Sequence, residues 1–294
     1  MELQKISQPY QRLLSEFSTF GIGGPVRYFL EVSSIQEMEK ALRFARENDL
    51  PFLILGKGSN CLFDDKGFEG LAILNKIDFC DYRASRVSVG SGYSFSLLGV
   101  QTARKGFSGL EFASGIPATV GGAVFMNAGA NGKETCDALE SVLYLHANGE
   151  KREYRKEELS FAYRFSSFQK MKGAILSATF SLHSDPTARA QQLKIIDYRM
   201  RTQPYKDKSA GCVFRNPQEG VSAGALIDQC GLKGFSFGGA KVSEMHANFI
   251  VNGGSASSRD VIELIRLIQE KVKEKTGVHL EPEIRLIGKD AVEP

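Results

Sequence analysis

The sequence FLILGKGSN, residues 52–60, is the stretch from which the fold can be worked out. It opens with a short apolar run, which predicts a buried strand, and two glycines follow that run directly. Glycine lets backbone N–H groups approach phosphate oxygens, and Ser59 and Asn60 can add side-chain hydrogen bonds. The spacing matches neither GxGxxG nor GxxxxGKS/T, so the residues leave open a phosphate-binding loop or a tight glycine turn.

A second glycine-rich stretch, GIPATVGGAVFMNAGA, occupies residues 115–130. Its glycines, proline and asparagine are spread over a segment too long for one turn, and the residues between them are apolar. Such a segment can follow a ligand along its length. Alternatively, its glycines allow close backbone packing inside a sheet.

Outward from these two stretches, apolar periodicity and helix-end signals predict an α+β chain. Ser34 and Glu37 form a capping-box pattern before a helix that ends at Pro51, and Asn148-Gly149 indicates a hairpin. Asp185-Pro186 predicts the N-cap and first residue of a helix that ends at Gln203-Pro204, and we expect a domain boundary there. Further strands are expected at 71–74, 86–90, 142–147, 174–182, 247–251 and 283–287, and further helices at 223–230 and 258–276.

Composition narrows the class of protein. With 294 residues the chain is long enough for two or more domains, and its 37 basic and 34 acidic residues give a net charge of +3. No basic run suggests bulk affinity for nucleic acid. Five widely spaced cysteines without a CxxC pair argue against a disulfide scaffold and a metal site. No long apolar run suggests export or a membrane span, so we expect a cytoplasmic protein.

Four side chains that can take part in chemistry stand in suggestive surroundings. Arg164 lies among aromatic residues in FAYRF, where burial would require an anionic partner, although a surface arginine resting on a ring is equally compatible. Cys212 lies in SAGCVFRNP beside a glycine turn and a cation, yet lone cysteines are usually buried apolar side chains. Glu283 precedes the expected strand at 283–287 and can face a cleft or solvent. His246 stands at a strand entrance and can equally be structural.

In this order the motifs resemble the UDP-N-acetylenolpyruvoylglucosamine reductases of peptidoglycan synthesis, the MurB family. The resemblance runs from TFGIGG (19–24) through both glycine-rich stretches to AYRFSSF, SAGCVFRNP, LIDQCGLKG, HANFIVN and LEPEIRLIG. Eight motifs in order are far more specific than any one of them. Only 48 positions separate Arg164 from Cys212 (212 − 164), which resembles the shorter subclass that lacks an inserted tyrosine-bearing loop.

The resemblance implies a vanillyl-alcohol-oxidase-type (PCMH-type) FAD-binding fold with a C-terminal α+β substrate domain. We expect FAD-binding subdomains at 1–75 and 76–184, and the substrate domain at 185–294. The cofactor is then non-covalent FAD, with NADPH as co-substrate and no nucleic-acid, membrane or obligate protein partner. The residues implied to bind FAD are Thr19, Gly21, Gly56, Lys57, Gly58, Ser59, Asn60, Gly115, Ile116, Pro117, Thr119, Val120, Gly121, Gly122, Asn127, Ala128 and Gly129.

The implied reaction is the reduction of UDP-N-acetylglucosamine enolpyruvate to UDP-N-acetylmuramate. NADPH reduces FAD, and the reduced flavin passes a hydride to the enolpyruvyl double bond. Arg164 and Glu283 match the pair that polarises the enolpyruvyl carboxylate, and Cys212 stands where the family commonly has a serine proton donor. Gln203, Arg215, Asn216 and His246 fall at implied contacts to the UDP-sugar.

Two other functions remain compatible with these residues. One is a flavin oxidase of the same fold; no histidine precedes His146 to tether the flavin in the first loop, although Cys61 leaves a thioether open. The other is a non-catalytic nucleotide-sugar-binding relative, which we expect to lack the arginine, acid and glutamate set present here.

Overall fold

The apolar run at 52–55 forms strand β3 (Phe52–Leu55), as predicted, at the edge of a four-stranded sheet. The structure, a computed structural model, describes residues 6–218 and 220–288. The strand order is β1-β2-β5-β3, with β2 and β3 parallel to β5 and β1 antiparallel to β2. The other strands are β1 (Arg12–Leu13), β2 (Pro25–Val32) and β5 (Phe68–Asn75).

Helix α1 (Ile35–Glu47) covers this first sheet. Ser34 caps it, as predicted, because its hydroxyl accepts a hydrogen bond from the backbone N–H of Glu37. The Glu37 carboxylate accepts from the N–H of Ser33 at 2.7 Å, one residue before the cap. The helix therefore begins where the capping pattern places it.

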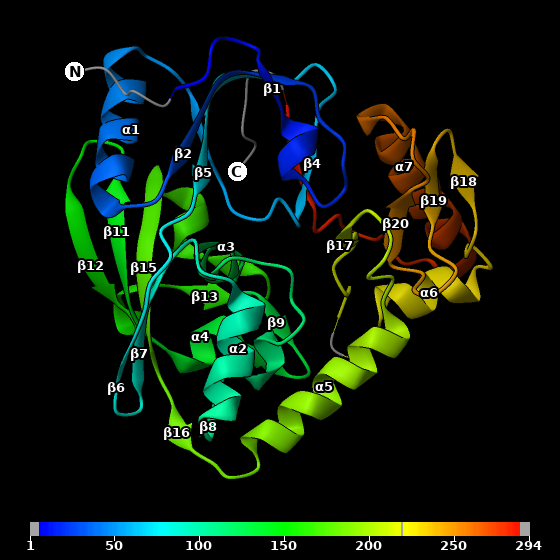
Figure 1. Cartoon of the computed structure of the whole chain (residues 1–294). Coiled ribbons are helices and arrows are strands. Elements are labelled where there is room, and N and C mark those ends of the chain that lie inside the picture. The colour runs from blue at the N-terminus through cyan, green and yellow to red at the C-terminus, as the bar shows by residue number, and fades with distance from the viewer. Residues whose placement is uncertain (1–5, 219, 289–294) are drawn as a thin grey trace.

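A second, antiparallel sheet lies below the first in Figure 1. Its order is β12-β11-β15-β7-β6, and the turn that contains Asn148-Gly149 joins β11 to β12 as predicted. The strands are β6 (Cys80–Arg83), β7 (Arg86–Gly90), β11 (Leu139–His146), β12 (Lys151–Arg155) and β15 (Gly173–Ser181). Around it lie α2 (Phe95–Arg104), α4 (Thr135–Ala138), and the short pairs β8 (Phe107–Ser108) with β16 (His183–Ser184), β9 (Gly129–Ala130) with β10 (Lys133–Glu134), and β13 (Phe161–Ala162) with β14 (Phe165–Ser166).

Part of the second glycine-rich stretch is a helix, α3 (Val120–Met126), which the sequence pattern did not reveal. Two adjacent glycines disfavour a helix by about 1 kcal/mol each, so local propensity argues against it. The helix is capped by Thr119, whose hydroxyl accepts from the N–H of Gly122, and it ends at Asn127 in the left-handed conformation. A Cβ on Gly121 would lie 2.9 Å from that of Ser91, so close packing requires glycine at this position.

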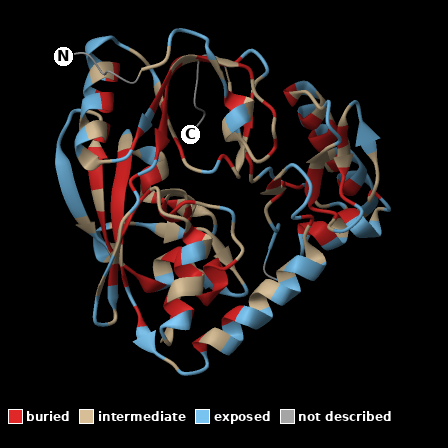
Figure 2. Cartoon of the chain, viewed as in Figure 1, coloured by how far each residue is buried: buried red, intermediate tan, exposed pale blue. Residues whose placement is uncertain are grey.

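Helix α5 (Ala188–Thr202) starts later than predicted. Asp185 is not its N-cap, because the Asp185 carboxylate accepts from the N–H and hydroxyl of Thr187, both at 2.7 Å, and so closes a turn before the helix. The predicted stop at Gln203 is confirmed as the C-cap. In Figure 1, α5 runs from the second sheet to the C-terminal unit, and Figure 2 shows it largely exposed or half-buried.

The C-terminal unit is a four-stranded antiparallel sheet, ordered β17-β20-β19-β18, packed against two helices. Both helices, α6 (Ala223–Gln229) and α7 (Ser258–Thr276), lie at or within a residue of their predicted ranges. The strands are β17 (Ser209–Cys212), β18 (Ser236–Phe237), β19 (Ala240–Val242) and β20 (Phe249–Asn252). The domain boundary at 185 stays a prediction.

The chain crosses between units at two places. Phe20, Ile22 and Leu62 from the N-terminal unit are buried in the core of the C-terminal unit. In the other direction, β21 (Arg285–Ile287) leaves that unit and pairs in parallel with β4 (Cys61–Phe63), directly after the first glycine loop. The units therefore share both core and backbone hydrogen bonds.

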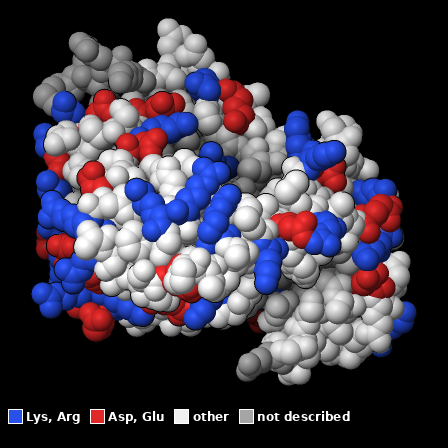
Figure 3. All heavy atoms as spheres, turned by 60° about the horizontal axis from the view of Figure 1, so that its bottom comes forward, with Lys and Arg blue, Asp and Glu red and all other residues white. Residues whose placement is uncertain are grey.

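No helix among the described residues is long and apolar enough to cross a membrane. On the face shown in Figure 3, Lys and Arg side chains are intermixed with acidic and uncharged ones.

Candidate active site

Three segments far apart in the sequence bring Arg164, Cys212 and Glu283 to one place. Arg164 lies in the turn between β13 and β14, Cys212 ends β17, and Glu283 lies just before β21. The backbone N–H of Glu283 donates to the carbonyl of Val213 at 2.7 Å, so the acid runs beside the residue that follows the cysteine. The three predicted catalytic residues are therefore neighbours in the fold.

Arg164 is held by contacts at both ends of the residue. Its guanidinium forms an ion pair with Glu283 (Nε to Oε1, 2.8 Å) and donates to the carbonyl of Gly129 at 3.1 Å. Its backbone is in the left-handed region (φ 57°), which is uncommon for a non-glycine residue, and its carbonyl accepts from the Gln169 amide at 3.0 Å. The surface-arginine alternative is wrong, because the side chain is only 20% exposed and is paired.

Charge in this cluster is strongly coupled. Burial disfavours the charged form of Arg164, but Glu283, with smaller contributions from Tyr163 and Cys212, outweighs burial, and the pKa of Arg164 lies above its usual range. Burial raises the pKa of Glu283, and the charges of Arg164 and Arg215 only partly counteract this. Glu283 is thus a carboxyl group whose proton affinity is increased beside a permanent cation.

Cys212 is protonated at neutral pH in this environment. Burial, and next the negative charge of Glu283, raise the pKa of its thiol to about 12, against the opposing charges of Arg164 and Arg199. A thiol in this state can donate a proton and is a poor nucleophile.

The two glycine-rich stretches meet beside this cluster. A Cβ on Gly56 would lie 2.4 Å from the hydroxyl oxygen of Thr119, and one on Gly58 would lie 2.1 Å from the carbonyl oxygen of Phe17. The first loop also touches the catalytic segments, because Asn60 Nδ2 donates to the carbonyl of Glu283 at 3.3 Å. Both loops and the three active side chains therefore line one region.

The first glycine-rich loop contains backbone N–H groups without a hydrogen-bond acceptor among the described residues. Among the described residues, nothing accepts a hydrogen bond from the N–H groups of Lys57, Gly58, Ser59 or Asn60. Four consecutive donors of this kind suit a phosphate or a similarly anionic group. This observation favours the phosphate-loop interpretation over the simple glycine turn.

Several polar groups of the second stretch are used within the protein. The N–H of Val120 donates to the carbonyl of Tyr93, and the Asn127 amide donates to Glu134 and to the carbonyl of Ala162. The hydroxyl of Ser114, just before this stretch, is buried and has no partner among the described residues. Ser114 lies outside the boundaries of the sequence motif, and its buried hydroxyl could take a polar partner.

The predicted substrate contacts lie in the C-terminal unit and at the end of α5. Gln203 caps that helix, while Arg215 is close enough to Glu283 to affect its pKa. The side-chain oxygen of Asn216 accepts from the backbone N–H of Ala223. The backbone N–H of Asn216 donates to the hydroxyl of Tyr163 at 3.3 Å. Burial lowers the pKa of His246, whose Nδ1 accepts from the N–H of Asn248. His246 thus has the contacts of a structural histidine, and its substrate role stays a prediction.

Other residues around the cluster were not evident from the sequence. Gln169 holds the backbone of Arg164, and the Tyr163 ring lies 4.8 Å from the guanidinium carbon of Arg164. Tyr163 lies within the AYRFSSF motif and Gln169 directly follows it, so their position near Arg164 was the available signal. Cys61 lies in β4 against an apolar cluster, and burial raises the pKa of its thiol to about 11.

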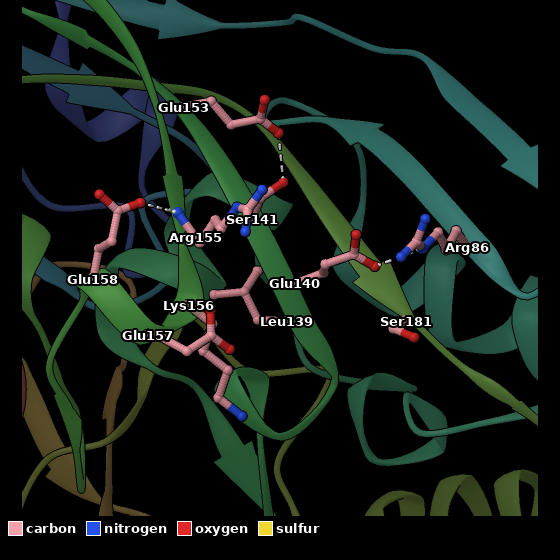
Figure 4. A pocket seen from close by; sticks show the side chains of 10 residues that line it. All are labelled: Arg86, Leu139, Glu140, Ser141, Glu153, Arg155, Lys156, Glu157, Glu158 and Ser181. Carbon is pink, nitrogen blue, oxygen red and sulfur yellow. Dashed lines mark hydrogen bonds and ion pairs between the residues drawn. The ribbon is translucent and has the colours of Figure 1, made fainter.

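A separate hollow of about 790 Å³ lies on the second sheet, away from these residues (Figure 4). Its lining is mostly charged, and Arg86 forms an ion pair with Glu140 there at 2.8 Å. None of the predicted site residues lines it. Among the described residues, no group of three or more His, Cys, Asp or Glu side chains could hold a metal ion.

Comparison with known proteins gives consistent matches along the chain. Residues 203–287 match the family described as "UDP-N-acetylenolpyruvoylglucosamine reductase, C-terminal domain", and residues 26–154 match an FAD binding domain. The UDP-N-acetylenolpyruvoylglucosamine reductase of Protochlamydia amoebophila is 59% identical over 97% of this chain and 96% of its own length. That of Chlamydia muridarum is 52% identical over 93% and 92%. The crystal structure of the corresponding reductase from Thermus caldophilus superposes with a TM-score of 0.79 at 39% identity, covering 94% of this chain and 97% of that one.

Proposed function

Because the chain belongs to the UDP-N-acetylenolpyruvoylglucosamine reductase family, we propose that Arg164, Cys212 and Glu283 carry out the proton-transfer half of that reduction. The protein is an FAD-dependent oxidoreductase that uses NADPH to reduce UDP-N-acetylenolpyruvoylglucosamine. The observation that carries the proposal is the convergence of these three side chains beside the two glycine-rich loops.

The residues present suit FAD. The free N–H groups of Lys57 to Asn60 can bind the pyrophosphate, and the unpaired hydroxyl of Ser114 can bind a polar edge of the cofactor. When bound, FAD accepts a hydride from NADPH and delivers it to one carbon of the enolpyruvyl double bond. The remaining predicted FAD contacts, and the substrate contacts at Gln203, Arg215, Asn216 and His246, belong to this proposal.

Arg164 and Glu283 bind and polarise the carboxylate of the enolpyruvyl group. Negative charge that develops on this carboxylate is stabilised by the fixed guanidinium, which Glu283 and the carbonyl of Gly129 hold in place. Glu283 can share a proton with the substrate carboxylate, because burial raises its pKa. The pair therefore favours the charged transition state over the substrate.

Cys212 donates the proton to the second carbon of the double bond. Its S–H bond breaks, a C–H bond forms, and the thiolate left behind is stabilised by nearby positive charge before it regains a proton from solvent. The thiol replaces a hydroxyl without changing this role, because both groups carry one transferable proton.

The proposal is tested by separating the two halves of the reaction in a stopped-flow instrument. Cys212→Ala should leave flavin reduction by NADPH within about twofold of wild type and slow reoxidation by the enolpyruvyl substrate at least about 100-fold. Cys212→Ser should retain reoxidation. Normal turnover by the alanine variant would assign the proton to another group.

The overall activity needs its own measurement. Purified protein should show a flavin spectrum, and oxidation of NADPH should depend on the enolpyruvyl substrate. Flavin-loaded protein that oxidises NADPH equally with and without this substrate would refute the proposed function.

A further inference from the structure

Between α5 and Cys212 the chain contacts the second glycine-rich stretch at Gly115 and the TFGIGG segment (19–24). Tyr205 contacts Gly115 at the start of the second stretch, and Lys208 covers Gly21, where a Cβ would lie 3.0 Å from Lys208 Cδ. The hydroxyl of Thr19 then donates to the carbonyl of Ser209 at 2.7 Å. The segment that delivers Cys212 is therefore attached to both sides of the FAD region.

One of these attachments is a closed triangle of hydrogen bonds. Arg199 Nε donates to the hydroxyl of Tyr205 (2.8 Å), and that hydroxyl donates to the carbonyl of Gly115 (2.8 Å). The second arm of Arg199 donates to the same carbonyl at 3.2 Å. Gly115 has φ +84°, and a Cβ there would lie 2.7 Å from the Tyr205 hydroxyl oxygen, so both conformation and space require glycine.

The charge of Arg199 has no acidic counterpart in this triangle. Both of its acceptors are neutral, and no carboxylate lies within ion-pair distance among the described residues. Its side chain is half-buried, and its positive charge acts on the Cys212 thiol from the α5 side. A cation placed in this way stabilises a thiolate as it forms.

We propose that the hydrogen bonds among Arg199, Tyr205 and the carbonyl of Gly115, here called the catch, fix the loop at Gly115 to the segment that carries Cys212. In this way they position the proton donor for the reduction. Neither residue lies in a motif that pointed to function, and both link the C-terminal segment to the FAD region without an inserted loop. Tyr205 supplies the closing contact, and the positive charge of Arg199 counteracts the effect of Glu283 on the Cys212 thiol. The catalytic part of this inference rests on the proposed role of Cys212.

Tyr205→Phe removes one hydroxyl and keeps the ring, so it tests the catch with little risk to folding. We expect backbone hydrogen exchange in residues 113–118 to accelerate about threefold or more, because the carbonyl of Gly115 loses a fixed partner. Reoxidation of the flavin by the enolpyruvyl substrate should slow about three- to tenfold, while flavin reduction by NADPH should not change. Tyr198→Phe is the matched control, because Tyr198 lies in α5 beside Arg199 and is 59% exposed.

Arg199→Gln tests the charge. It should slow reoxidation about 10- to 100-fold and increase the solvent deuterium isotope effect on that step, because proton transfer becomes more rate-limiting. Arg199→Lys should restore the isotope effect while leaving exchange at 113–118 fast, since lysine keeps the charge but loses the forked geometry. Lys194→Gln on the exposed face of α5 controls for charge alone.

Hydrogen exchange needs no turnover, so it separates this inference from the proposed function. If wild-type protein fails to reduce the enolpyruvyl substrate but Tyr205→Phe loosens residues 113–118, the catch stands and the proposed function falls. The catch would be overturned if Tyr205→Phe and Arg199→Gln showed the same hydrogen exchange and the same rate of flavin reoxidation as the two control variants.

Discussion

At the scale of single residues, Cys212 carries a thiol, a group that is reactive as a thiolate, in surroundings that keep it protonated and so lower its reactivity as a nucleophile. The nucleophile in alkylation is the thiolate, and the neighbourhood of Cys212 favours the protonated form. Replacement of a hydroxyl by a thiol at a proton-donor position therefore carries less risk of side reactions than an exposed cysteine would.

This leads to a pH-dependent prediction. A thiol with a pKa of about 12 has a thiolate fraction of about one in 10,000 at pH 8, so iodoacetamide should label Cys212 far more slowly in the folded protein than in the unfolded chain. Because the pKa is raised, the labelling rate should increase about tenfold for each pH unit from 8 to 11. Peptide mass spectrometry measures this rate, and rapid labelling at pH 8 with intact folding would contradict the protonated assignment.

At the scale of elements, α3 shows how a helix of low propensity can be required by its surroundings. Gly121 packs against Ser91, whereas a Cβ on Gly122 meets only the Thr119 hydroxyl, at an ordinary contact distance of 3.4 Å. The space beside Gly122 is thus open in the protein and is available for a ligand.

Gly122→Ala separates the role of this glycine in helix stability from its role in leaving space for a ligand. We expect the protein without FAD to keep or slightly gain thermal stability, since alanine favours a helix by about 1 kcal/mol, while FAD affinity falls. Flavin fluorescence titration and thermal unfolding measure the two effects. Gly56→Ala should weaken both, because its Cβ would meet Thr119 at 2.4 Å. Unchanged FAD affinity in Gly122→Ala would remove this residue from the cofactor site.

The start of α7 is capped from another unit. The Asp65 carboxylate, which follows β4, accepts from the backbone N–H of Ser258 at 2.7 Å and from its hydroxyl at 2.8 Å. Asp65→Ala should lower the free energy of unfolding by about 1–2 kcal/mol in urea titrations, because the helix loses an acceptor and a negative charge at its N-terminus while its N-cap Ser257 remains. Asp65→Asn keeps an acceptor and should lose less; equal losses would show that the hydrogen bonds matter little.

At the scale of the whole molecule, the return of the chain to the first unit positions Glu283, the residue proposed to polarise the substrate carboxylate together with Arg164. Glu283 lies between the contact with Val213 and strand β21, whose Ile287 is 2% exposed in the core of the first unit. Positioning of Glu283 thus depends on elements of both units.

Ile287→Asp tests this dependence. Burying a charge at this position should cost about 3 kcal/mol or more and detach β21 from β4. Chemical denaturation measures the cost, and Ile287→Val should be tolerated. Preserved stability and activity in the aspartate variant would show that β21 does not hold Glu283.

The sequence predicted much of this architecture, and the misses have physical causes. Long periodic segments such as 258–276 and the buried run at 52–55 were predicted correctly because local pattern and tertiary packing agree there. Helix α3 was missed because packing overrides the low propensity of its glycines, and α5 starts late because Asp185 closes a turn instead. For the site, the motifs indicated Arg164, Cys212 and Glu283, and the structure brings them together. Ser114, Arg199 and Tyr205 could not be predicted, since their contacts depend on segments distant in the sequence.

Phe20, Ile22 and Leu62 lie in the core of the C-terminal unit, and this affects which parts of the chain can be exchanged between related proteins. A gene exchange limited to residues 203–287 would transfer a core without three of its buried side chains. We expect chimeras between relatives to be more stable when segments 19–22 and 60–63 are exchanged together with the C-terminal part. Packing thus joins residues 203–287 to the start of the chain, although the two matched families cover separate parts of it.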